Sequence, residues 1–510
     1  MQAIAADQRT EASLSRPSPA RFAAAVIAIA LTSWLPVLVG ATTRTTLGWL
    51  AAAALALVVE KMTRQLIPAA LVAGLFVSSA LVPSGLVTEA THYMPIAVTG
   101  GALALRVGLD AWRARRLSGL TAQPVMVAVG LYLAWAAVTT LTSTDHRTSV
   151  IYLAGMVGVC ALAFWAIPKM LTDRSAGEAV LATLGMLGVV IAVSVYVVAV
   201  VGAVDVFGRP VGDVQRVDLT VLGHATGVFF DRSSGVYMAP LEASVVMVIG
   251  IGSLLGWSVT RTGRPLLAAR LAMVIMVPAI LLTLDRTAWL AAIVATGAFA
   301  ALARAARLKA ATAGVLCLFF ALFFLLVFSN VIGVNAVLAN TCTTNCAPGS
   351  DEAPLRGGTG LTGREYLWLA SIYAIETRPV FGFGPGNDVP ALVPYLGGGG
   401  VHIQGLTSHS TWLRTGVEMG IPGLAFLIGV LGAVAWAGRR GLRRLLDEGN
   451  AFQLALIASV CGLIPAMTFE TFLLGGVAFS SLYLTLAVGL IAGRLTYVPL
   501  EARPARHERA

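Results

Sequence analysis

The chain has 510 residues, of which 57% are apolar and 12% are charged, with a formal net charge of +10. A water-soluble domain usually carries about 25% charged residues. This composition therefore excludes a soluble enzyme, a secreted disulfide scaffold and a disordered protein. One helix across a bilayer needs about 20 mostly apolar residues, so the sequence predicts an all-α, polytopic bundle of about 12–14 transmembrane helices.

The apolar stretches predict the helices in chain order. The expected spans are 22–40, 45–60, 66–82, 94–109, 124–141, 149–167, 179–202, 238–257, 271–285, 287–303, 311–332, 411–437, 451–468 and 474–492. They divide the chain into a cytoplasmic tail (1–21), an N-terminal transmembrane bundle (22–202), an outer loop (203–237), transmembrane helices (238–332), a long outer catalytic loop (333–410), C-terminal transmembrane helices (411–492) and a cytoplasmic tail (493–510).

Basic residues set the expected orientation. Most of the 35 Lys and Arg residues fall in alternate loops and in both tails. The positive-inside rule then places those loops and both termini in the cytoplasm. Residues 1–21 hold three arginines and no cleavage signature, so we expect the first span to be a retained helix.

Ten arginines, and no lysine, fall in or beside the expected outer loops. They are Arg44, Arg147, Arg209, Arg216, Arg232, Arg286, Arg356, Arg364, Arg378 and Arg414. A guanidinium is a rigid fork that matches phosphate or carboxylate. Each arginine alone is explained by solvation or by contact with lipid headgroups, but together they favour an outer face that binds anions.

The five cysteines do not indicate a catalytic or metal-binding site. Cys160, Cys317 and Cys461 lie inside expected spans and behave as small core residues. Cys342 and Cys346 lie in the long outer loop, on the oxidising side, so we predict a local disulfide. They form an incomplete ligand set, so no metal site is predicted there.

The segment 363–378 is predicted to be a surface helix. It opens with Arg364, and Trp368, Ile372 and Ile375 recur at helical spacing on one face. Its short length and its polar residues suit a helix that lies at the membrane surface. An arginine at a helix N-terminus is unfavourable unless an anion is near it.

Irregular backbone is expected after that helix. Pro379 ends it, and the glycines of 382–386 force a turn. A glycine run at 397–400 predicts a hinge. His409 stands immediately before the next span, where Ser410 (or Ser408) can cap the helix.

Three motifs stand out between about residues 230 and 430. They are Arg232-Ser-Ser-Gly235-Val-Tyr with Pro240, Asp285-Arg286-Thr-Ala-Trp289-Leu290, and the long run Gly363-Arg364, Trp368, Pro379, Gly382-Phe-Gly384-Pro385-Gly386, His409-Ser410, Leu413, Glu418-Met-Gly420 and Gly423-Leu424. Together they resemble the O-antigen ligase and O-antigen polymerase family. The chain departs from the family pattern at Ser410 (usually Asn), at Asp285 (usually Ser) and at Leu241-Glu242.

The resemblance implies a metal-independent membrane glycosyltransferase of the GT-C type, with no cofactor. Such an enzyme takes a glycan from a polyprenyl-diphosphate carrier and transfers it to the hydroxyl of a glycan or lipid acceptor. It works on the outer face of the bacterial cytoplasmic (inner) membrane, among membrane lipids and without nucleic acid. Outside the cell, nucleotide sugars are absent, so a lipid-linked donor also agrees with the expected position of the arginines.

The resemblance also assigns roles to residues. Arg286, Arg364 and His409 are the expected catalytic residues: the arginines bind the diphosphate, and His409 acts either as a base at the acceptor hydroxyl or as a donor to the diphosphate. Arg232, Arg378 and Glu418 are expected to bind substrate.

The sequence does not decide the roles of three acidic residues, Glu242, Glu418 and Glu470. Arg414 and Glu418 are spaced for an ordinary i,i+4 ion pair, so Glu418 can also serve only to fix its helix. Glu242 and Glu470 lie near span ends, where ionisable groups are functional candidates, yet the sequence identifies a partner for neither.

Several alternatives remain at this point. A polymerase of the same family uses the same donor with a lipid-linked chain as acceptor; the order of the histidine block slightly favours a ligase. A flippase or exporter of lipid-linked glycan would also use basic residues, but at the membrane midplane in broken helices. A structural scaffold would not require the arginine and histidine motifs.

Overall fold

A computed structural model gives the fold. The structure describes residues 19–38, 67–80, 98–103, 106, 124–171, 174–202, 204–206, 209–211, 214–222, 224–235, 240–259, 261–329, 332–336, 364–396, 407–448, 450–476 and 478–496. The expected span 45–60 and the cysteines Cys342 and Cys346 lie outside these residues.

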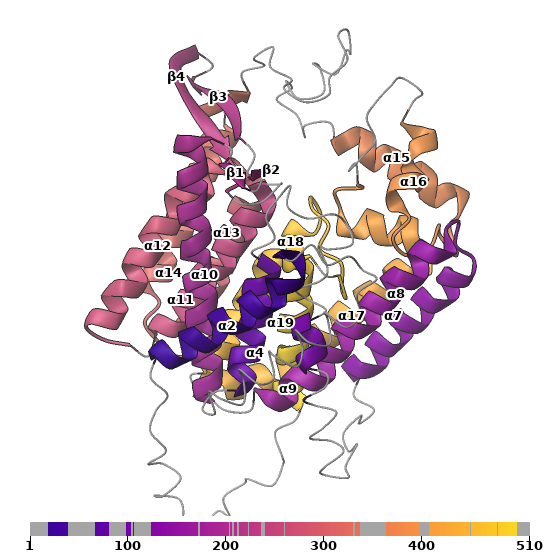
Figure 1. Cartoon of the computed structure of the whole chain (residues 1–510), viewed down its shortest axis with the longest axis horizontal. Coiled ribbons are helices and arrows are strands. Elements are labelled where there is room, and N and C mark those ends of the chain that lie inside the picture. Colours follow the sequence, from indigo (N-terminus) through magenta and orange to yellow (C-terminus); the bar gives the residue numbers. More distant parts are fainter. Residues whose placement is uncertain are drawn as a thin grey trace, which may run out of the picture.

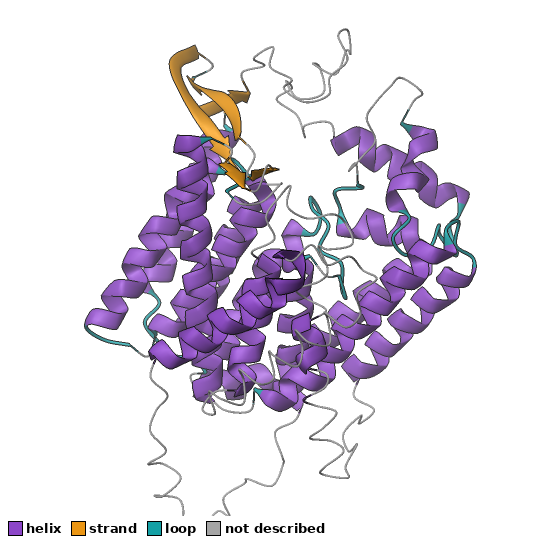
Figure 2. Cartoon of the chain, in the orientation of Figure 1, coloured by secondary structure: helices purple, strands orange, loops and turns teal. Residues whose placement is uncertain are grey.

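The described residues form a helical bundle with a small amount of sheet (Figures 1 and 2). The main helices are α2 (Pro19–Leu38), α4 (Ile67–Ala80), α7 (Pro124–Leu141), α8 (His146–Ala161), α9 (Ile167–Met170), α10 (Arg174–Val201), α11 (Pro240–Ser258), α12 (Arg264–Leu282), α13 (Arg286–Ala305), α14 (Ala311–Phe328), α15 (Arg364–Thr377), α16 (Asp388–Leu392), α17 (Thr411–Glu448), α18 (Ala451–Ala466) and α19 (Phe479–Thr496). A π-helical turn, Leu162–Ala166, joins α8 to α9.

Seven helices of the described part are long and apolar enough to cross a membrane, and five shorter apolar helices accompany them. This confirms the expected all-α membrane bundle. Most of the expected spans that fall on described residues coincide with helices to within a few residues. The expected span 271–285 is an exception at its start, because α12 begins at Arg264.

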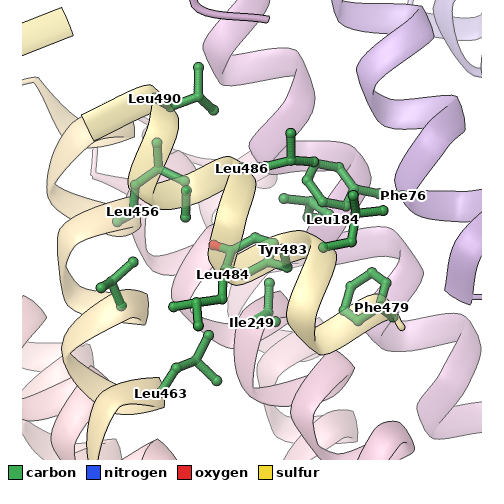
Figure 3. Packing of buried hydrophobic residues seen from close by; sticks show 14 of the residues in the cluster. Phe76, Leu184, Ile249, Leu456, Leu463, Phe479, Tyr483, Leu484, Leu486 and Leu490 are labelled. Carbon is green, nitrogen blue, oxygen red and sulfur yellow. The ribbon is translucent and has the colours of Figure 1, made fainter. Parts of the chain in front are cut away.

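The core lies where α10, α11, α18 and α19 meet (Figure 3). Phe76 of α4 contacts Phe479 and Tyr483 of α19, with ring centroids 6.1 and 5.6 Å apart. Helices approach closely where side chains are small: a Cβ on Gly250 would lie 3.1 Å from the Cα of Gly188 on the neighbouring helix. Small residues at helix contacts are typical of membrane bundles.

Three elements meet at one end of the bundle, which we call the site end. The Ser244 hydroxyl of α11 donates to Oδ2 of Asp285, which caps α13, at 2.8 Å. A Cβ on Gly462 of α18 would lie 2.5 Å from the Ala291 carbonyl oxygen. Since α13 begins here and α18 ends here, Ala466 lies about one helical turn further along, beside the start of α13.

The expected outer loop 203–237 contains strands. They are β1 (Val204–Val206), β2 (Arg209–Val211), β3 (Val214–Val221) and β4 (His224–Ser233). A fifth strand, β5 (Ile332–Ala336), comes from the next expected outer segment and completes an antiparallel sheet of order β4-β3-β5. The sheet lies at the upper left in Figure 2 and connects the two segments that the sequence predicted separately.

A second, smaller core lies at the upper right of Figure 1. Ala370 and Ala374 of α15 pack against Ala391 and Leu392 of α16 and Val417 of α17. This cluster is separate from the main core. The first part of α17 therefore packs with α15 and α16 as one unit.

Candidate functional site

Helix α15 confirms the predicted surface helix. It begins at Arg364 and ends at Thr377, just before Pro379. Its buried face carries Ala370, Ser371 and Ala374, while Ile372 is 43% exposed. The face that packs on the protein thus consists of small residues together with the buried Leu367, and part of the large apolar surface points away from it.

The turn that follows α15, residues 382–386, packs against a break in α17, and we call it the glycine turn. Gly420 has φ +68° and Pro422 lacks an N–H, so the carbonyls just before the break lose helical partners. The turn replaces them: Phe383 N donates to Val417 O at 2.9 Å, and Gly384 N donates to Glu418 O at 2.8 Å. The Trp135 indole donates to the next carbonyl, Met419 O, at 2.8 Å.

Asn387 attaches this turn to helix α8. Its Nδ2 donates to the hydroxyls of Ser143 and Ser149, each at 2.9 Å, and the Asn387 side chain is buried. Nearby, Asp145 caps α8, and a hydrogen bond from the Thr148 hydroxyl lowers the pKa of the Asp145 carboxyl. The turn is therefore held from two sides, by α17 and by α8.

His409 lies at the entrance to α17. Its φ of +42° is unusual for a residue other than glycine, and such outliers cluster at functional sites. The expected cap is present, since Ser410 Oγ accepts from Leu413 N at 3.5 Å. Thr411 ties this entrance to the segment after α18: its N–H donates to Met467 O at 2.8 Å, and its hydroxyl donates to Glu470 O at 2.9 Å.

Glu470 brings two of the predicted catalytic residues together. One carboxylate oxygen, Oε1, accepts from Arg364 Nη2, and the other, Oε2, lies 3.4 Å from His409 Nδ1. Arg364 also donates through Nη1 to the Phe469 carbonyl at 2.9 Å. We call Arg364, Glu470 and His409 the Glu470 cluster. The side chains of Arg364 and His409 remain 23% and 33% exposed, while that of Glu470 is 6% exposed.

Arg286 lies at the same end of the bundle. It is the first residue of α13 and is exposed. None of the ion pairs among the described residues includes it. Asp285, its neighbour in the chain, accepts from Thr287 N at 3.0 Å and from the Ser244 hydroxyl.

A second charged group is buried nearby. Arg414 Nε donates to Glu418 Oε1 at 2.7 Å, which confirms the predicted i,i+4 pair, and Arg414 Nη2 lies 3.4 Å from Asp388 Oδ1. We call these three residues the Arg414 cluster. Its side chains are 12%, 4% and 1% exposed for Arg414, Glu418 and Asp388, so it connects α16 to α17 in the interior.

Two residues that were expected to bind substrate, Arg232 and Arg378, lie outside both charged clusters. Arg232 lies in β4, opposite Gln215 of β3, and only its backbone is described. Arg378 is exposed, with its guanidinium carbon 5.0 Å from the centre of the Phe383 ring. Neither belongs to the Glu470 cluster.

Residues 271–428 match the family model described as O-antigen ligase. This segment of the chain is similar to that family. The matched segment contains Arg286, Arg364 and His409, whereas Glu470 and Arg232 lie outside it. No curated protein matches the chain. Together with the long apolar helices, this similarity supports a glycosyltransferase-like, multi-pass membrane protein.

Proposed function

We propose that this protein transfers a glycan from a polyprenyl-diphosphate carrier to an acceptor hydroxyl, without a metal ion, at the outer face of the cytoplasmic membrane. The observation that carries the proposal is the Glu470 cluster. Two residues of the family motifs, far apart in the sequence, share one carboxylate and keep part of their side chains exposed.

The distribution of charge supports an outward-facing site end. The loops and helix ends at the opposite end of α11, α12, α13 and α14 hold six basic residues: Arg261, Arg264, Arg270, Arg304, Arg307 and Lys309. Cytoplasmic loops are the ones enriched in such residues. The site end then faces outward, where a lipid-linked donor is the available source of sugar.

The arginines are suited to the leaving group. As the sugar leaves, negative charge builds on the oxygen of the diphosphate, and fixed cations in a water-poor site stabilise such charge. The two bonds that Arg364 makes use two of its five N–H groups, which leaves three for phosphate oxygens. Arg286, exposed at the same end, is the second diphosphate-binding residue, and Arg232 is a weaker third.

His409 is suited to act as the base. A carboxylate beside Nδ1 favours the tautomer in which Nδ1 carries the proton, and this leaves Nε2 able to accept one. In the reaction, the acceptor oxygen attacks the anomeric carbon, its proton moves to Nε2, and the bond to the diphosphate breaks with its electron pair going to the carrier. Glu470 is a positioning residue that orients both His409 and Arg364.

The test uses purified full-length protein in lipid nanodiscs with a labelled polyprenyl-diphosphate-linked oligosaccharide and an acceptor glycolipid. We expect a new, labelled glycolipid. Asparagine tolerates a positive φ, so His409→Asn should keep the backbone at this position. It should lower the rate by about 10²–10⁴-fold, which is the usual contribution of general acid–base catalysis. Arg364→Ala and Arg286→Ala should each lower it by about 10²–10³-fold. Arg270→Ala, an exposed arginine at the opposite end, is the matched control.

The same assay separates the alternatives. Growth of the lipid-linked chain itself would identify a polymerase. In sealed vesicles, movement of label without a new bond would identify a flippase. Full activity of all three variants, in protein that inserts normally, would overturn the catalytic roles proposed here.

A further inference from the structure

Several buried polar atoms at the site end have no hydrogen-bond partner. Across the described residues, such side-chain atoms belong to Trp34, Ser253, Arg261, Trp368, Ser408, Gln453 and Thr471. Three of these side chains adjoin the Glu470 cluster along the chain. Trp368 is one helical turn after Arg364, Ser408 directly precedes His409, and Thr471 directly follows Glu470.

This arrangement calls for a physical explanation. A buried donor or acceptor without a partner is unfavourable, and a native structure that retains one often does so for a water or a ligand. Ser408 is completely buried, and its backbone N–H lies 3.5 Å from Asp388 Oδ2, so the residue is held in place while its hydroxyl is unpaired. Trp368 is held by contact with the Phe469 ring, 6.0 Å between centroids.

We propose that the Trp368 indole N–H and the hydroxyls of Ser408 and Thr471 bind hydroxyl groups of the glycan next to the Glu470 cluster. The proposal rests on the proposed function and names the part of the substrate that these atoms recognise. An indole N–H only donates, whereas the two hydroxyls both donate and accept. Sugar hydroxyls can match this set, while a diphosphate would be better served by the arginines.

The three atoms are shielded from solvent in the present conformation. In the same conformation, Arg364 and His409 both contact the Glu470 carboxylate. A glycan can reach the unpaired atoms only if this region opens. Substrate binding at this site therefore includes a local rearrangement that exchanges unpaired protein groups for sugar contacts.

The test compares two ligands on variants that remove a polar atom. The variants are Ser408→Ala and Thr471→Val, which keep the shape closely, and Trp368→Phe, which also makes the ring smaller and is read against Trp34→Phe. The ligands are a polyprenyl-diphosphate-linked oligosaccharide and bare polyprenyl diphosphate, and binding is measured by titration of protein in nanodiscs. Ser253→Ala and Trp34→Phe remove equally unpaired atoms elsewhere in the bundle and serve as matched controls.

We expect each site variant to bind the glycosylated lipid about three- to tenfold more weakly, as the loss of one neutral hydrogen bond predicts. Binding of the bare lipid should stay unchanged, and the controls should behave as wild type. For Ser408→Ala and Thr471→Val, the melting temperature without ligand should stay the same or rise, because an unpaired buried group has been removed.

Two results would overturn the proposal. Unchanged preference for the glycosylated lipid in all three variants would show that these atoms do not contact sugar. Equal loss of both ligands would show that the residues support the site only structurally. If wild-type protein binds the glycosylated lipid preferentially but transfers nothing, the proposed function fails while the glycan site stands.

Discussion

The Glu470 cluster and the Arg414 cluster are built from the same kinds of side chain but differ in exposure. Each pairs an arginine with a carboxylate, and each includes residues of the family motifs. Arg414 is 12% exposed and contacts two carboxylates, whereas Arg364 is 23% exposed and His409 33%. In the proposed function, the more exposed cations of the Glu470 cluster act on the substrate, whereas the buried Arg414 stabilises the fold.

The largest expected effect is on stability, at the Arg414 cluster. Arg414→Ala leaves Glu418 and Asp388 buried without their cation, and breaking a buried pair in this way costs about 3–5 kcal/mol. Thermal unfolding of the purified variant in detergent measures the loss. Arg270→Ala, on an exposed arginine, should change stability by no more than about 0.5 kcal/mol. Equal melting of the two variants would contradict a structural role for the Arg414 cluster.

Glu470→Gln should affect the rate more than the fold. The amide keeps the size of the side chain but removes the charge that orients Arg364 and His409. Losing a charge-assisted hydrogen bond costs about 1.5–3 kcal/mol, so we expect the transfer rate to fall by about 10- to 100-fold. Glu470→Asp, which keeps the charge, should retain more of the rate than Glu470→Gln. Equal losses in the two variants would argue for a merely structural role.

Asn387→Ala tests whether the glycine turn depends on its attachment to α8. The change removes the donor shared by the Ser143 and Ser149 hydroxyls and should cost about 1–3 kcal/mol of stability. Limited proteolysis should then cut more readily within 378–387. Unchanged protease resistance would show that the contacts with α17 hold the turn alone.

Arg378→Ala should have the smallest effect. The side chain is exposed and contacts the Phe383 ring, an interaction worth about 0.5–1 kcal/mol at exposed sites. The transfer rate should fall by less than tenfold, well short of the loss in Arg364→Ala. A loss as large as that of Arg364→Ala would extend the diphosphate site to Arg378.

Local signals predicted much of the fold. The apolar runs located most of the described helices, and Pro379 with the glycines after it located the end of α15. The sequence analysis did not predict the strands, although residues 216–221 alternate polar and apolar side chains, which is a strand signal. The pairing of β3 with β5 joins segments far apart in the chain, and no local pattern specifies it.

Only part of the candidate site could be predicted, because local patterns do not specify contacts between distant segments. Motifs identified Arg364 and His409, and spacing identified the Arg414–Glu418 pair. Glu470 was recognised only as an ionisable group near a span end. Its partners lie 106 and 61 residues away, so only the folded chain shows that one carboxylate serves both.

The break at Gly420 has a mechanical consequence. Residues before it pack with α15 and α16 through Val417, while the longer remainder of α17 crosses the bundle. Membrane helices adapt to bilayer thickness by tilting. We expect the glycine to absorb tilt of the long portion, which insulates the geometry around His409 from the thickness of the surrounding bilayer.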